Sequence, residues 1–187
     1  MAPPPKKSPV QRLLHLAAAA AGVAALALAA LLWQQLAAPA LPARQAPRVA
    51  ADPALVERGA YLARAGNCAG CHSARGGQPY AGGRAIATPF GTVYAGNLTP
   101  DAETGLGRWS SEAFWRAMHH GQSRDGRLLV PAFPYDSYTR VSREDSDAIH
   151  AFLGRLPAVA QANRPHALRW PYNTQLALAA LRTLYFE

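Results

Sequence analysis

The two cysteines of this chain stand three positions apart, at Cys68 and Cys71, and His72 follows the second directly. A disulfide between residues so close in sequence could not join distant parts of a fold. Three potential ligands are also too few to close a structural zinc site, which takes four thiols or imidazoles. The loop around them, residues 65–77, is short and rich in glycine. The pattern therefore indicates that these three side chains hold a bound group.

The order Cys-x-x-Cys-His is the attachment pattern of a c-type haem. The two thiols would add to the two vinyl groups of one haem, and the next residue, His72, would supply an axial imidazole to the iron. A redox-active dithiol is one alternative, but it is expected beside a strand–helix–strand pattern, which we do not find around this motif. Half of a zinc site is the other alternative. We predict one covalently attached haem c per chain, bound by Cys68, Cys71 and His72.

An apolar segment near the N-terminus predicts export of this motif. Residues 1–12 are basic and rich in proline, and residues 13–33 contain no lysine, arginine or acid. A helix of 21 residues rises roughly 31 Å, enough to cross the hydrocarbon core of a membrane. We therefore expect a cytoplasmic N-terminus, a transmembrane anchor or signal helix over residues 13–35, and an Ala/Pro-rich linker over residues 36–52. The small residues Ala38-Pro39-Ala40 offer a cleavage site for the signal alternative.

Composition limits the rest of the chain to one modest domain of short helices and shaped loops. It has 15 glycines and 16 prolines, and half of its residues are hydrophobic. The net charge is +8, but no run of basic residues alternates with aromatic ones, so we expect no nucleic-acid partner.

Three short helices are predicted around the motif, over residues 52–66, 110–121 and 142–156. Asp52, Ser110 or Ser111, and Ser142 are the expected N-caps, the last in a variant capping box with Asp145. Gly59 in the first helix would allow close approach of another helix, and packing of the first helix on the third would close the domain.

The segment between the first two helices, residues 76–110, shows no regular period and is expected to wrap a flat macrocycle. Its candidate contacts with the haem propionates are Arg84, Asn97, Thr99 and Trp109. We expect His150 and His166 to face solvent.

The last segment, residues 157–187, is interpreted as a C-terminal extension. Asn173 is the expected cap of a largely apolar helix over residues 174–187. Such a helix must be covered, either by the domain itself or by a dehydrogenase subunit or the membrane.

Long stretches of the sequence resemble the cytochrome c subunits of membrane-bound bacterial dehydrogenases. They are residues 59–72, 79–109 and 125–153, and the resemblance extends over about residues 53–186. The Pro-Ala-Phe-Pro-Tyr-Asp stretch and the tail are similar to the group that partners molybdenum hydroxylases; other members partner alcohol and aldehyde dehydrogenases. The resemblance implies an all-α, class I cytochrome c-like domain of about three to five short helices, here residues 53–156. Many members carry three haem domains, so this chain is expected to be a single-haem protein or a piece of a longer one.

The resemblance leaves the sixth iron ligand open. Many relatives carry a liganding methionine at the position of Phe133, which cannot coordinate iron. Apart from Met1, the chain has one methionine, Met118. A thioether from Met118, an imidazole from His119 or His120, and an open position all remain possible here, and Met118 could instead fill the core.

These observations predict electron transfer rather than catalysis. The expected protein is a single-pass component of a bacterial inner membrane, with its haem in the periplasm. A dehydrogenase would donate the electrons, and quinone, an oxidase or another cytochrome would accept them. A gas-binding protein or redox enzyme with an open sixth position is the first alternative. A structural membrane subunit whose haem is incidental is the second.

Overall fold

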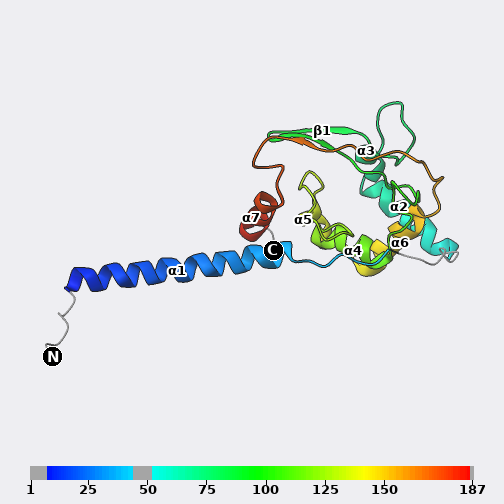
Figure 1. The fold of residues 1–187 in the computed structure, drawn as a ribbon. Coiled ribbons are helices and arrows are strands. Elements are labelled where there is room, and N and C mark those ends of the chain that lie inside the picture. The colour runs from blue at the N-terminus through cyan, green and yellow to red at the C-terminus, as the bar shows by residue number, and fades with distance from the viewer. Residues whose placement is uncertain (1–7, 44–51, 186–187) are drawn as a thin grey trace.

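The computed structural model describes residues 8–43 and 52–185, which form one long helix and a mostly helical body (Figure 1). The predicted helical fold is confirmed, and a small sheet that was not predicted accompanies it. The elements follow in the order α1 (Pro9–Leu36), α2 (Pro53–Ala65), α3 (Cys68–His72), β1 (Ala85–Thr88), β2 (Gly91–Tyr94), α4 (Ser111–His120), α5 (Tyr135–Tyr138), α6 (Arg143–Leu153), β3 (Ala167–Leu168) and α7 (Gln175–Tyr185).

Helix α1 begins four residues before the apolar stretch. Ser8 caps it, because its hydroxyl accepts from the Gln11 amide while the Gln11 side chain accepts from the Ser8 amide, and Pro9 occupies the first helical position. None of its residues is buried. By length and composition the helix could cross a membrane, since its most apolar window has a mean hydropathy of 2.2.

Helices α2 and α6 cross at Gly59, as predicted. A Cβ at Gly59 would lie 1.9 Å from the Ala148 carbonyl oxygen, so only glycine allows this approach. Ala63 of α2 and Ala148 of α6 are fully buried at the crossing. The predicted packing of the first helix on the third is therefore present and closes the domain.

The predicted N-caps of α4 and α6 are also confirmed, although α6 ends at Leu153, three residues before the predicted end. The Ser110 hydroxyl accepts from the Ala113 amide, and Gly121 ends α4 in the left-handed conformation at φ 57°. The Ser142 hydroxyl accepts from the Asp145 amide. The Asp145 carboxylate pairs with Arg58 of α2 at 2.6 Å, which adds an ion pair to the α2–α6 interface.

The segment expected to lack regular structure contains an antiparallel hairpin. Strands β1 and β2 pair from Ala85–Tyr94 to Thr88–Gly91, and β3 adds to β2 through Gly91–Leu168 and Thr92–Ala167. Gly91 has a φ of 130°, and a Cβ there would meet the Ala167 carbonyl oxygen at 2.3 Å. The sheet therefore ties the extension after α6 back to the loop between α3 and α4.

Helix α7 begins at Gln175 and packs against the end of α1. Its cap is Thr174, whose hydroxyl accepts from the Ala177 amide, so the prediction of Asn173 as the cap is wrong by one residue. Leu178 and Ala179 are buried in a cluster that includes Leu32 of α1.

Residues 37–43 run along the body rather than away from it. The Leu41 amide donates to the Arg124 carbonyl at 2.7 Å, and the Arg116 guanidinium donates to the Pro39 carbonyl at 2.7 Å. A Cβ at Gly126 would meet the Ala38 carbonyl oxygen at 2.3 Å. The rest of the predicted linker up to residue 51 lies outside the described residues.

Candidate haem site

The motif residues form a short helix, α3, that depends on the residues just before and within it. Asn67 precedes the helix in the left-handed conformation, at φ 51°. The Gly70 amide donates to the Asn67 carbonyl at 3.0 Å, and a Cβ at Gly70 would lie 2.4 Å from the Asn67 side-chain oxygen. A side chain at position 70 would therefore displace the Asn67 side chain from the place it occupies against the helix.

Both cysteines are free thiols, and they differ in exposure. Cys68 is partly buried and packs against the main hydrophobic cluster, whereas Cys71 is exposed. Burial raises the pKa of the Cys68 thiol above its ordinary value. Cys68 is thus a neutral thiol at the edge of an apolar cluster.

His72 is oriented by one hydrogen bond. Its Nδ1 lies 2.7 Å from the Gly96 carbonyl oxygen, so Nδ1 carries the proton and donates, and Nε2 keeps its lone pair. Burial lowers the pKa of His72, which favours this neutral imidazole. A carbonyl partner of this kind fixes the ring of a metal-ligating histidine. His72 therefore presents Nε2 as a ligand in a fixed orientation.

Backbone contacts fix the position of the Gly96 carbonyl that bonds to His72. Gly82 lies between the two, and its amide donates to the His72 carbonyl at 2.8 Å. Gly82 has a φ of 78°, and a Cβ there would lie 2.6 Å from the Gly96 carbonyl carbon. The next amide, of Gly83, donates to the Ala95 carbonyl at 2.8 Å. Three segments far apart in the sequence thus meet at the histidine.

An apolar cluster lies against the motif. Its buried members come from the loop, α4 and α6, and Cys68 and Ala69 of the motif pack against it. The buried members are Tyr80, Leu106, Phe114, Met118, Ile149 and Leu153. These side chains are the apolar surroundings that a haem attached at Cys68 would meet.

Two tyrosines near the motif were not singled out from the sequence. Burial raises the pKa of both Tyr80 and Tyr138. Tyr80 belongs to the apolar cluster, and Tyr138 and Cys68 both pack against it. Tyr138 also donates to the Gly66 carbonyl at 3.1 Å. The positive φ of Tyr80, 61°, cannot be read from its residue type.

The three candidates for the sixth ligand occupy different environments on α4. Met118 is 6% exposed and belongs to the cluster beside the motif. His119 packs on Trp115 with ring centroids 4.2 Å apart, and His120 is exposed. Met118 therefore shares a cluster with the motif, and the two histidines are not members of it.

The candidate propionate contacts divide into two groups. Asn97 and Thr99 are buried. The side-chain amide nitrogen of Asn97, Nδ2, donates to the Thr104 hydroxyl at 3.0 Å and to the Val159 carbonyl at 2.8 Å. The side-chain oxygen of Asn97, Oδ1, accepts from the backbone amide of Thr99 at 2.9 Å and from the Thr99 hydroxyl at 2.7 Å. Both donors and both lone pairs of Asn97 are therefore used within the protein.

The other two candidates, Trp109 and Arg84, lie in different surroundings. Trp109 is partly buried and packs against the cluster beside the motif, and Arg84 is exposed on the strand side of the loop. The structure thus brings Trp109 to the motif's surroundings and leaves Arg84 at the surface.

The prediction that His150 faces solvent is wrong. Its ring is 8% exposed and stacks on Phe114 at 5.1 Å between centroids. Ile149 and His150 are both buried on the inner face of α6. The apolar pattern of the sequence placed Ile149 on this face but gave no sign that the neighbouring histidine shares it. His166 is exposed, as predicted, and its Nδ1 accepts from the Tyr94 amide at 3.2 Å.

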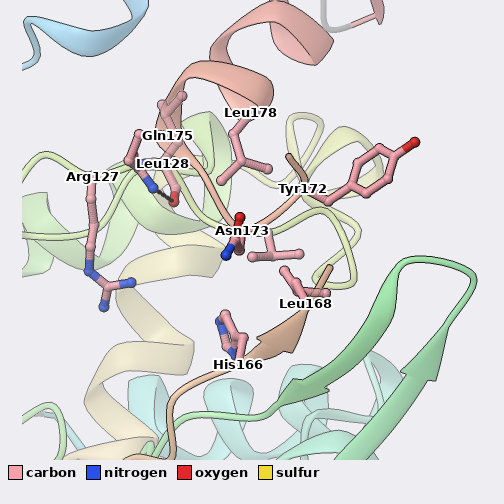
Figure 2. A pocket seen from close by; sticks show the side chains of 9 residues that line it. Arg127, Leu128, His166, Leu168, Tyr172, Asn173, Gln175 and Leu178 are labelled. Carbon is pink, nitrogen blue, oxygen red and sulfur yellow. Dashed lines mark hydrogen bonds between the residues drawn. The ribbon is translucent and has the colours of Figure 1, made fainter. Parts of the chain in front are cut away.

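A cavity of about 220 Å³ lies away from the motif, between α7, β3 and the loop before α5 (Figure 2). Figure 2 shows His166, Asn173 and Tyr172 around it, with the Gln175 side chain bonded to the Leu128 backbone. None of the motif residues lines this cavity. Over residues 8–43 and 52–185, no group of three or more His, Cys, Asp or Glu side chains is arranged to bind a metal.

Comparison with known proteins identifies relatives that share most of this chain. The gluconate 2-dehydrogenase cytochrome c subunit of Pantoea cypripedii is 48% identical over 136 residues, which is 72% of this chain and 31% of that protein. A nicotinate dehydrogenase subunit of Pseudomonas putida is 46% identical over 134 residues, 72% of this chain and 11% of that protein. The alcohol dehydrogenase (quinone) cytochrome c subunit of Komagataeibacter europaeus is 43% identical over 136 residues, 72% of this chain and 29% of that protein.

The chain therefore spans less than a third of the length of each of these relatives. A match to a protein family covers residues 56–157, which run from α2 across the motif to the end of α6. This is the part in which the oriented histidine, the thiols and the apolar cluster come together, and over it the chain belongs to the cytochrome c family.

Proposed function

We propose that this chain is a membrane-anchored cytochrome c with one haem, which takes electrons from a dehydrogenase and passes them to the respiratory chain. The observation that carries the proposal is the orientation of His72 beside two free thiols, with Nδ1 bonded to the Gly96 carbonyl and Nε2 left as a ligand. In this proposal Cys68 and Cys71 would form the two thioether links, and His72 would bind the iron through Nε2. A bound haem c supplies reversible one-electron chemistry at its iron.

The chain's own residues would set the properties of that site. The Gly96 carbonyl keeps His72 in one tautomer and raises its basicity as a ligand. The buried cluster around Met118 excludes water from one side of the site. Both effects tune the reduction potential without any group of the protein changing its covalent bonds.

We further propose Met118 as the sixth ligand, since it shares the cluster with Cys68 and the neighbouring histidines do not. Of the propionate candidates, Trp109 is supported by its packing against the cluster beside the motif. Asn97 and Thr99 are better explained as the residues that tie the loop to the segment after α6. The test of the ligand is the ferric spectrum of wild type, Met118→Leu and His119→Gln. A weak sulfur-to-iron band near the red edge should disappear only in Met118→Leu, and carbon monoxide should then bind the reduced protein.

The choice of donor is supported by the relatives. Three of them are subunits of gluconate, nicotinate and alcohol dehydrogenases, and each is much longer than this chain. We propose a dehydrogenase of this general kind as the donor, of the alcohol and aldehyde type or of the molybdenum-hydroxylase type. Quinone, an oxidase or another cytochrome would be the acceptor.

Contacts at the end of α1 favour an uncleaved anchor over a signal peptide. The candidate cleavage site, Ala38-Pro39-Ala40, is packed against the body through Gly126 and the bond from Arg116 to the Pro39 carbonyl. Cleavage would remove these contacts and the α1 residues that cover α7. We therefore propose residues 13–35 as a membrane span, residues 1–12 in the cytoplasm, and the haem domain of residues 53–156 with its extension of residues 157–187 in the periplasm.

The function is tested with full-length protein made in cells that attach haem c. Wild type should keep its red colour after boiling in detergent, and the double variant Cys68→Ala/Cys71→Ala should lose it. Membranes that contain the dehydrogenase should reduce the haem when its substrate is added. Colourless wild-type protein with two reactive thiols would overturn the assignment of the cofactor, and a haem that no dehydrogenase substrate reduces would overturn the assignment of the donor.

A further inference from the structure

We propose that α7 and the aromatic residues just before it lie in the surface of the lipid bilayer that α1 crosses. This inference rests on the proposed membrane span. It goes beyond that span, because it gives the haem domain a second attachment to the same membrane.

The position of α7 along α1 is the first support. Leu178 and Ala179 pack in a cluster with Leu32, and the Arg182 guanidinium donates to the Gln35 side chain at 3.0 Å. Leu32 and Gln35 belong to the last turn of α1, where the apolar stretch ends. If α1 spans the bilayer, these contacts place α7 at the depth where the span leaves it (Figure 1).

The outward face of α7 is the second support. Leu176, Leu184 and Tyr185 are 57%, 71% and 79% exposed. The one charged residue of the helix, Arg182, is buried against α1 and does not contribute to this face. A helix with a buried inner face and an uncharged, apolar outer face fits a hydrocarbon boundary better than water.

Aromatic residues extend this face towards the sheet. Trp170 is 81% exposed, and Tyr172 packs on Phe90 with ring centroids 4.3 Å apart. Phe90 belongs to the turn between β1 and β2, which lies with α7 on the side of the body from which α1 extends (Figure 1). Tryptophan and tyrosine concentrate at the level of lipid head groups.

The charge of the C-terminal segment is complementary to an anionic bilayer surface. No acid occurs between Asp147 and Glu187, whereas the same stretch contains four arginines. One of them, Arg169, is exposed beside the aromatic residues and donates to the Pro89 carbonyl. Arginines beside a membrane span are attracted to anionic head groups.

The experiment uses a polarity-sensitive fluorophore on single introduced cysteines in the full-length, haem-loaded protein. In that protein the thioether links occupy Cys68 and Cys71, so the introduced thiol is the reactive one. Leu184→Cys reports on α7, Val23→Cys on the middle of α1, and Glu144→Cys on the exposed surface of α6. The proteins are placed in nanodiscs of phosphatidylcholine with phosphatidylglycerol, and the Soret spectrum verifies the fold of each variant.

We expect the labels at positions 184 and 23 to be quenched by a nitroxide lipid and to be severalfold less sensitive to aqueous iodide than the label at position 144. Iodide quenching at position 184 equal to that at position 144, with position 23 in lipid, would overturn the inference and leave the span intact. Protection of position 184 from both quenchers would also overturn it, since a protein surface would then cover α7. Iodide access at position 23 would overturn the span itself.

Discussion

Replacing Gly59 with alanine should destabilise the haem domain. The new Cβ would lie 1.9 Å from the Ala148 carbonyl oxygen, 2.5 Å from its carbonyl carbon and 3.0 Å from the Ile149 amide nitrogen. All three neighbours are backbone atoms of α6, so no side chain can rotate away. Helices α2 and α6 must therefore separate by about 1 Å or more along the crossing.

The expected loss follows from two opposing terms. Overpacking a core costs about 1–3 kcal/mol, and backbone contacts place this site at the upper end. Alanine in a helix gains about 1 kcal/mol over glycine, which offsets part of the cost. We expect a net loss of about 2 kcal/mol in the free energy of unfolding, and hence a Tm lowered by roughly 8–16 °C for a domain of this size.

Thermal unfolding of the haem-loaded chain, followed by far-ultraviolet circular dichroism, measures this effect. The matched control is Gly22→Ala in α1, where a Cβ would meet nothing within 4 Å. The control should leave the Tm of the domain unchanged. A Tm of Gly59→Ala within about 2 °C of wild type would refute the argument, because the helices could then not be in the contact described.

Three further changes probe other parts of the domain. Asn97→Ala removes a buried side-chain amide whose hydrogen bonds are all made within the protein, and it should lower the free energy of unfolding in urea by about 2–4 kcal/mol. The reduction potential of the haem should change little. A large change in potential at unchanged stability would instead assign Asn97 to a propionate. His166 is exposed, but the protein around its ring withdraws part of it from water and so lowers its pKa. Its folded form therefore binds fewer protons than the unfolded chain, and stability should fall as the pH drops through 6.5. His166→Gln should flatten that decline between pH 7.5 and 5.5, and an unaltered slope would contradict it. Ser142→Ala removes the α6 cap and should lower stability by about 1 kcal/mol, whereas an unchanged urea midpoint would show that the cap contributes nothing.

The helices could be predicted because their signals are local. Caps at Asp52, Ser110 and Ser142 and the stop at Gly121 each act within one turn of the chain. The hairpin could not be predicted in the same way. Its four-residue strands, such as Ala85–Thr88, are too short for a clear alternation, and β2 is completed by Leu168, more than seventy residues later.

The residues of the candidate site differ in how far the sequence can indicate them. The five-residue motif identifies Cys68, Cys71 and His72, because haem attachment needs those residues at that spacing. The partner of His72 is a backbone carbonyl, at Gly96, and a carbonyl has no residue type to recognise. Asn97 was selected as a polar residue in the right loop, but only the three-dimensional contacts with Val159 and Thr104 show that its bonds are already used.

The residue at position 133 affects which side chain is available as the sixth iron ligand. By resemblance it occupies the place of a liganding methionine, yet its ring stacks on Tyr138 with centroids 5.1 Å apart and an interplanar angle of 11°. Tyr138 in turn donates to the Gly66 carbonyl, two residues before Cys68. The segment that would carry a ligand is therefore engaged in aromatic packing next to the motif. Apart from Met1, Met118 of α4 is the one methionine in the sequence, so the spectrum of Met118→Leu tests the proposed sixth ligand.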